Sequence, residues 1–264
     1  RWLQTYPDTP MEAHIFVTHY HWDHIQGIPF FAPLYSEKNK FHFYSFRSKH
    51  LGSGSLQRVL EAQMATPYFP VDTSAMTAQR DFTEIAGGDT IQINDSKLTA
   101  RWLNHPQGCL GFRLETPEGT LVYATDNEPG VPELDKSLRE LALGADIFIN
   151  DAQYSPEQLA GPKKGWGHSS WLEGVRVAEE AKVKNLLLFH HDPDSSDKMV
   201  DAILAQARQK GGNVWAAAEG MIMTMGSPGA AVALPSSRTA QRRRTHYPAK
   251  VEGYSEDGAP ISEQ

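Results

Sequence analysis

Seven consecutive residues decide how this chain is interpreted: Thr18-His19-Tyr20-His21-Trp22-Asp23-His24. They place three imidazoles and one carboxylate within six positions, and both groups are common metal ligands. The stretch follows the β-branched and aromatic run 15–17, which is typical of a buried strand, and it precedes Gly27 and Pro29. We therefore expect the histidines on a turn that leaves a strand, where a rigid scaffold presents reactive groups. A histidine-rich loop without metal is the alternative, and it accounts poorly for the carboxylate.

The side chains of this stretch can point toward two separate positions. His19 and His21 can point toward one position, while Asp23 and His24 turn toward a second. Such a pair of positions suits two ions a few ångströms apart that share a nucleophilic water.

The pattern His-x-His-x-Asp-His after an apolar strand resembles the signature of the metallo-β-lactamase-fold hydrolases. The resemblance implies an α/β protein, an αββα sandwich of two mixed β-sheets with flanking helices. It also implies further ligands at later strand ends, and three are available: His105, Asp126 and His190. Only 18 residues precede His19, so we expect that the first strands of this fold are missing.

Regular structure is expected around these ligands. Apolar periodicity predicts strands at 41–46, 91–93, 98–103, 111–115, 120–125, 146–151 and 185–189, with two short strands within 214–225. It predicts helices at 53–65, 132–143, about 170–183 and 197–210. His105, Asp126 and His190 each follow one of the predicted strands.

Carried over residue by residue, the resemblance assigns seven ligands to two metal ions: His19, His21 and His105 to the first, Asp23, His24 and His190 to the second, and Asp126 as a bridge. Nitrogen and oxygen ligands without a thiolate fit zinc, with manganese or iron as alternatives. Asp23 would also orient the nucleophile, a metal-bridged hydroxide, or accept a proton.

Two neighbouring residues offer alternatives within this set. His191 also follows the strand 185–189 and could replace His190, although the strand-terminal position matches the family. Asp151 is expected to support or cap the site rather than to bind metal.

His168 is the candidate catalytic residue outside the ligand set. It lies in the segment 165–170 before a predicted helix, and the order of helix, strand and histidine that follows resembles the ribonuclease Z and cyclic phosphodiesterase branch of the family. That branch has a His-Ser-Thr-like motif here, whose histidine stabilises or protonates the phosphodiester. A departing alkoxide needs a proton, and the pentacoordinate centre needs a donor. The alternative is a helix-capping segment with an incidental histidine.

These residues together predict a binuclear hydrolase that acts on a small or cyclic phosphodiester. Ribonuclease Z carries a long substrate-binding arm between the positions that match His105 and Asp126, where only a hairpin fits in this chain. The net charge of −7 is also unfavourable for extended nucleic acid, which we therefore do not expect as a partner. The alternatives are hydrolysis of a lactam, lactone or thioester by the same metals, and a non-catalytic metal-binding sensor.

Composition sets the remaining expectations. Hydrophobic content of 40% and charged content of 22% are typical of a soluble globular protein. No apolar run approaches the roughly 20 residues of a membrane span. No secretory leader opens the chain and Cys109 is its one cysteine, so we expect a cytoplasmic protein. We assign 1–226 to the hydrolase domain and 227–264 to a flexible tail or the start of a further module. The oligomeric state is open, and a dimer is compatible.

Overall fold

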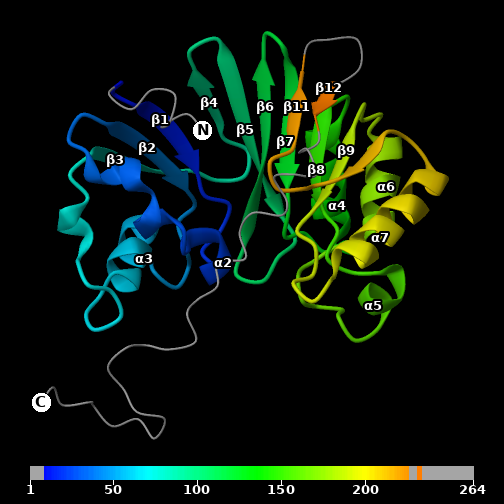
Figure 1. Cartoon of the computed structure of the whole chain (residues 1–264), viewed down its shortest axis with the longest axis horizontal. Helices are drawn as coiled ribbons and strands as arrows, with labels where there is room; N and C mark the ends of the chain where they lie inside the picture. The colour runs from blue at the N-terminus through cyan, green and yellow to red at the C-terminus, as the bar shows by residue number, and fades with distance from the viewer. Residues whose placement is uncertain (1–8, 226–230, 234–264) are drawn as a thin grey trace, which may run out of the picture.

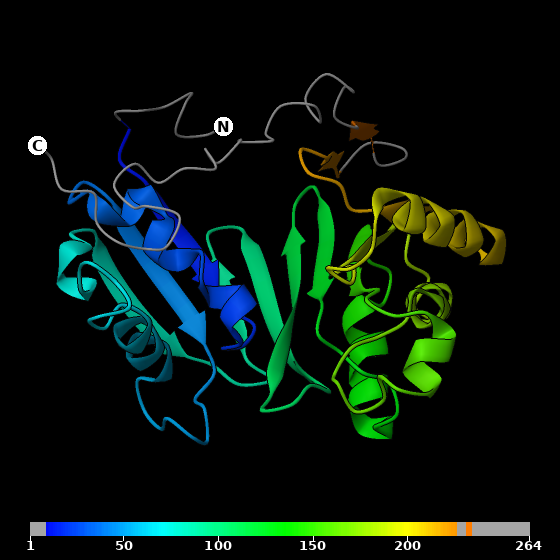
Figure 2. The same cartoon turned by 60° about the horizontal axis from the view of Figure 1, so that its bottom comes forward.

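A computed structural model of the chain describes residues 9–225 and the backbone of 231–233. Two β-sheets face one another, and helices cover their outer sides (Figures 1 and 2). The predicted αββα sandwich is thereby confirmed. The expectation that the first strands are missing concerns chain before the described residues and stays a prediction.

The smaller sheet consists of three parallel strands: β1 (Glu12–Phe16), β2 (Lys40–Ser45) and β3 (Gln79–Glu84). Phe41 and Phe43 of β2 are fully buried on the outer face, where they pack with Leu56 and Leu60 of helix α3 (Ser55–Gln63). Within the described residues this sheet is entirely parallel, whereas the sequence predicted two mixed sheets. The crossover between β1 and β2 explains the difference, because it contains helical turns and returns the chain to the same end of the sheet.

Seven strands form the larger, mixed sheet, in the order β10 (Val214–Ala216), β9 (Leu186–Phe189), β8 (Ile147–Asp151), β7 (Gly119–Ala124), β6 (Cys109–Thr116), β5 (Ser96–Leu103) and β4 (Thr90–Ile93). The strands from β10 to β7 are parallel, and those from β7 to β4 are antiparallel. An apolar cluster that includes Phe16, Tyr44, Leu98 and Phe112 lies between the two sheets.

The remaining elements are short or lie outside the sheets. The helices are α2 (Trp22–Ile25), α4 (Pro132–Ala142), α5 (Pro156–Ala160), α6 (Trp171–Glu180) and α7 (Asp197–Lys210), with 3-10 turns at Ile28–Phe30, Ala32–Tyr35 and Thr73–Ala75. A two-stranded sheet pairs β11 (Ile222–Thr224) with β12 (Ala231–Ala233), so a strand lies within the predicted tail. The rest of that tail falls outside the described residues. Among the helices of the described part, none has both the length and the hydropathy of a membrane span.

The direction of the strands brings the predicted ligands to one edge. Because β7, β8 and β9 are parallel, their carboxyl ends meet at the same edge of the larger sheet. The antiparallel pairs β5–β6 and β6–β7 make β5 run in the same direction as β7. His105, Asp126 and His190 follow β5, β7 and β9, so all three lie at this edge. The end of β1 is attached nearby, because Leu110 N donates to Thr18 O over 3.0 Å.

A substitution of Phe148 tests the hydrophobic core next to this edge. Its side chain on β8 is fully buried among residues that pack between the larger sheet and helices α4 and α6. Phe148→Ala should lower the free energy of unfolding by about 3–5 kcal/mol, because it removes apolar contacts and leaves a cavity. Phe30→Ala is the matched control, since Phe30 is 75% exposed. Equal midpoints of urea denaturation for the two variants would contradict this account of the core.

Candidate metal centre

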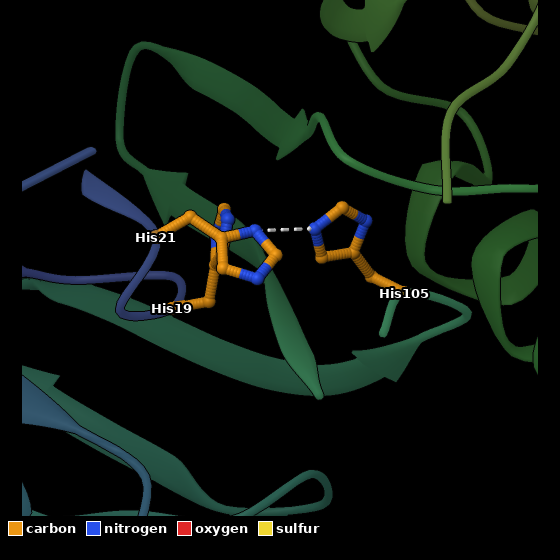
Figure 3. Close-up of side chains that lie close together, drawn as sticks. All are labelled: His19, His21 and His105. Carbon is orange, nitrogen blue, oxygen red and sulfur yellow. Dashed lines mark hydrogen bonds between the residues drawn. The ribbon is translucent and has the colours of Figure 1, made fainter. Parts of the chain in front are cut away.

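Three histidines from two separate segments form the first part of the site. His19 and His21 follow β1, His105 follows β5, and Figure 3 shows their rings turned toward one another. His21 Nδ1 lies 3.0 Å from His105 Nε2, and each of the three residues offers a nitrogen within 4.8 Å of the others. The structure thus brings together the residues expected to hold the first metal ion.

A second group lies between helix α2 and the end of β9. Asp23, His24 and His190 each offer a ligand atom within 4.8 Å of the other two. Asp23 Oδ2 is 3.2 Å from His24 Nε2 and 3.7 Å from His190 Nε2. These are the residues expected to hold the second ion.

Asp126 lies between the two groups and is almost completely buried. Its Oδ1 is 3.3 Å from His24 Nε2, 3.5 Å from His190 Nε2 and 3.9 Å from His19 Nε2. Both Asp126 and His190 have a left-handed backbone, with φ of 60° and 56°. Non-glycine residues adopt this conformation at an energetic cost and often do so at functional sites. Here it turns both side chains from the strand ends into the cluster.

Burial and neighbouring charges set the protonation of this cluster. Burial, reinforced by the nearby His24, lowers the pKa of His19 to about 2, so its ring is neutral. Burial alone would lower the pKa of His24 and raise that of Asp126. The contact between the two outweighs burial, so the pKa of His24 is raised and that of Asp126 is lowered. Asp126 is therefore ionised at neutral pH.

The donor atoms fit a divalent metal ion. His19 Nε2 and Asp126 Oδ2 are buried without a hydrogen-bond partner in the described part of the chain, although buried polar groups are normally paired. Two tetrahedral ligands about 2.0–2.1 Å from a zinc ion lie about 3.3 Å apart. The separations of 3.0 Å between His21 and His105, and of 3.3 Å between His24 and Asp126, are close to that value. The division of the seven residues between two ions stays a prediction.

The structure separates His190 from its alternative, His191. His190 belongs to the cluster around Asp126 and Asp23, whereas His191 belongs to none of the ligand groups found in the described residues. Both ring nitrogens of His191 are buried and have no hydrogen-bond partner among the described residues, and burial lowers the pKa of this ring. The geometry favours His190 as the ligand.

The contrast between His190 and His191 leads to a prediction about metal content. His190→Ala should remove most of one metal ion per folded chain, because it deletes a nitrogen that faces Asp23 and Asp126. His191→Ala should retain both ions. Metal analysis of the gel-filtered proteins measures the difference, and circular dichroism checks that each variant is folded. Loss of an ion only from the His191 variant would reverse the assignment.

Asp151 supports the site from behind. It is fully buried, and its two oxygens accept hydrogen bonds from the backbone amides of Asp126 (2.9 Å), Gln153 (3.0 Å) and Ser169 (3.2 Å). One of its oxygens lies within ligand distance of Asp126, His168 and His190. Together with the contact from His168 Nδ1, however, the three amides fill the roughly four acceptor positions of a carboxylate. Their number favours the supporting role that the sequence suggested over metal ligation.

His168 lies beside the ligand cluster. Its Nδ1 is 2.9 Å from Asp151 Oδ2, and its ring stacks on His190 with the centroids 5.0 Å apart. Burial lowers the pKa of His168, but the hydrogen bond to Asp151 outweighs it and the pKa is raised. Helix α6 is capped by Ser170, whose side chain accepts from Glu173 N. The capping alternative therefore applies to Ser170, while His168 points toward the carboxylates.

Two contacts to the rings of candidate ligands were not predicted from the sequence. Thr18 Oγ1 lies 3.0 Å from His19 Nδ1, which leaves Nε2 of that ring free. The carbonyl of Gly167 accepts from His105 Nδ1 over 2.7 Å, so this ring also presents Nε2 to the cluster. Such outer partners fix the tautomer of ligating histidines. Thr18 was visible within the motif, but no sequence signal linked Gly167 to His105.

Known proteins share the two-sheet fold that carries this cluster of histidines and aspartates. A solved diphosphatase from the PhnP family shares the fold, with a TM-score of 0.57 at 20% identity over 83% of this chain and 73% of that chain. The chain belongs to the β-lactamase superfamily, because the Beta-lactamase superfamily domain matches residues 4–191.

Two curated relatives show how far the similarity extends. An uncharacterized protein, ML1173 of Mycobacterium leprae, is 27% identical over 195 residues, which are 74% of this chain but only 64% of that protein. A ribonuclease Z of Exiguobacterium is 26% identical over 220 residues, with 67% of this chain and 70% of the relative covered. The sequence led us to expect that extended nucleic acid is not a partner. The similarity to a ribonuclease Z does not support that expectation.

Proposed function

We propose that this protein is a binuclear metal-dependent phosphodiesterase. The observation that carries the two-metal part of the proposal is the position of Asp126, whose Oδ1 lies within 3.9 Å of Nε2 of His19, His24 and His190. The preference for phosphodiesters rests on His168, which lies beside this cluster. One carboxylate thus faces ligand candidates from both groups, as a bridge between two ions requires. We assign zinc to the site, with manganese and iron as the alternatives that these ligands accept.

The residues of the chain account for the proton transfers of such a reaction. Divalent ions held there would lower the pKa of water and polarise a phosphoryl oxygen. Asp23 is 61% exposed at its side chain, where it can accept the proton of the attacking water. As the water oxygen bonds to phosphorus, the bond from phosphorus to the leaving oxygen breaks. His168, held by Asp151, can give that oxygen its proton.

The substrate class rests on two opposing observations. In the described residues, only strands β6 and β7 and their turns lie between His105 and Asp126, which favours a small or cyclic phosphodiester over one that needs a long binding arm. The similarity to a ribonuclease Z favours RNA as the second candidate.

Turnover of matched substrates tests the proposal. The zinc-loaded protein should hydrolyse bis-p-nitrophenyl phosphate, and removal of the metals by a chelator should abolish this activity. A chromogenic lactam, a lactone and a thioester should be poor substrates. Turnover of the carbonyl substrates alone would overturn the phosphodiesterase assignment. A protein that binds two ions and hydrolyses no ester at all would instead be a metal-binding sensor.

A second assay separates the two substrate classes. A cyclic nucleotide and a transfer-RNA precursor should be compared at equal concentrations of scissile bonds. Faster cleavage of the cyclic nucleotide is expected. Preferential cleavage of the RNA would assign the chain to nucleic-acid processing while leaving the metal chemistry intact.

A further inference from the structure

Glu128 is a buried acidic residue that lies two positions after Asp126 and belongs to none of the ligand groups found in the described part of the chain. Each of its carboxylate oxygens accepts a hydrogen bond from the backbone. Oε1 accepts from Gly165 N over 2.7 Å, and Oε2 accepts from Gly167 N over 2.8 Å. Both glycines have a left-handed backbone, with φ of 85° and 87°. The carboxylate therefore holds together a turn whose conformation glycine adopts without strain.

The glycine turn contacts the metal centre directly. The carbonyl of Gly167 accepts from His105 Nδ1, and a Cβ atom on Gly167 would lie only 2.3 Å from that nitrogen. The turn is thus packed against the His105 ring with no room for a side chain. The next residue is His168, whose ring is held by Asp151. A shift of the turn would move both histidines.

The backbone of Glu128 also bonds to the chain segment that carries His105. Glu128 N donates to the carbonyl of Asn104 over 2.8 Å, and Asn104 Nδ2 donates to the carbonyl of Glu128 over 2.8 Å. Asn104 immediately precedes His105. Together with the peptide bond between Asn104 and His105, the hydrogen bonds close a ring that runs from Glu128 through Gly167 and His105 to Asn104 and back.

We propose that Glu128 is a positioning residue that holds His105 toward the first metal ion and His168 toward the substrate, an inference that rests on the proposed function. Hydrogen bonds to an ionised acceptor are roughly twice as strong as neutral ones. Without the carboxylate, two glycine amides would lose their partner and the turn would gain freedom. Residues that orient metal ligands typically contribute about 10–100-fold to metal affinity or activity.

Glu128→Gln is the sharpest variant, because the amide keeps the shape of the side chain but turns an NH₂ group toward one glycine amide. We expect about 10–100-fold weaker affinity for one of the two ions, measured by competition with a chromophoric chelator. The visible spectrum of the cobalt-substituted protein should also change. With a phosphodiester that has a poor leaving group, kcat should fall while KM changes little. Glu133→Gln on the exposed start of α4 is the matched control and should match the wild type in every measurement.

The outcomes separate this proposal from the proposed function. A wild-type protein that binds no metal or hydrolyses no ester would refute the function. If the wild type binds two ions and Glu128→Gln leaves affinity, spectrum and kcat unchanged, the positioning role is refuted. If the variant fails to fold, hydrogen exchange in the ¹⁵N-labelled wild type tests the positioning role instead. Slow exchange at Gly165 N, Gly167 N and His105 Nδ1 is expected, and rapid exchange at all three would overturn the proposal.

Discussion

Asp126→Ala is expected to remove most of both metal ions and to abolish hydrolysis. The wild type should approach two ions per chain. Asp126 Oδ1 lies near nitrogens from both ligand groups, so its loss affects both sites at once. It also leaves His24 without the carboxylate that raises its pKa. Metal content per folded chain, measured by plasma mass spectrometry after gel filtration, is the test.

The backbone of Asp126 requires a second variant. Alanine in a left-handed conformation costs about 1–2 kcal/mol, whereas asparagine tolerates it. Asp126→Asn therefore removes the charge with little backbone penalty and should lose the metals as well. Asp201→Ala, on the exposed face of α7, is the control for loss of an acid. Two ions retained in both Asp126 variants would show that the bridging assignment is wrong, and loss of one ion would assign Asp126 to a single site.

The sequence predicted the position of the site because each ligand candidate follows a strong local pattern. An apolar strand followed by a polar ligand occurs at His105, Asp126 and His190, and parallel strands bring such ends to one edge. His19 and His21 could be placed from the predicted turn after β1 alone. The residues 22–25 were expected as part of a turn, and the structure forms a single helical turn, α2, that presents Asp23 and His24.

The sequence could not predict the contacts that depend on backbone atoms or on distant pairing. Glu128 binds two glycine amides 37 and 39 positions away, and no side-chain pattern marks such partners. The all-parallel pairing of β1, β2 and β3 depends on the path of long crossovers, whereas apolar periodicity reports only that each strand exists. Local sequence therefore located the candidate ligands, and the tertiary structure shows which residues contact them.

His168→Ala is expected to retain both metal ions and the fold while activity falls on demanding substrates. Its ring lies beside His190, and its Nδ1 is occupied by Asp151, so Nε2 is the nitrogen left for the substrate. General acid–base groups typically contribute about 10²–10⁴-fold in rate. A loss of that order is expected for a phosphodiester with an alkoxide leaving group. Bis-p-nitrophenyl phosphate should lose much less, because p-nitrophenolate leaves without a proton.

The comparison of the two substrates identifies the role of His168. A loss confined to the alkoxide ester would indicate proton donation. Equal losses on both would indicate electrostatic stabilisation of the transition state, because that contribution does not depend on the leaving group. His42→Ala is the matched control, since His42 pairs with Glu12 and Asp81 on the smaller sheet, outside the ligand groups. Full activity of His168→Ala on both esters, with both ions bound, would leave His168 without a catalytic role and remove the main argument for phosphodiesters over carbonyl esters.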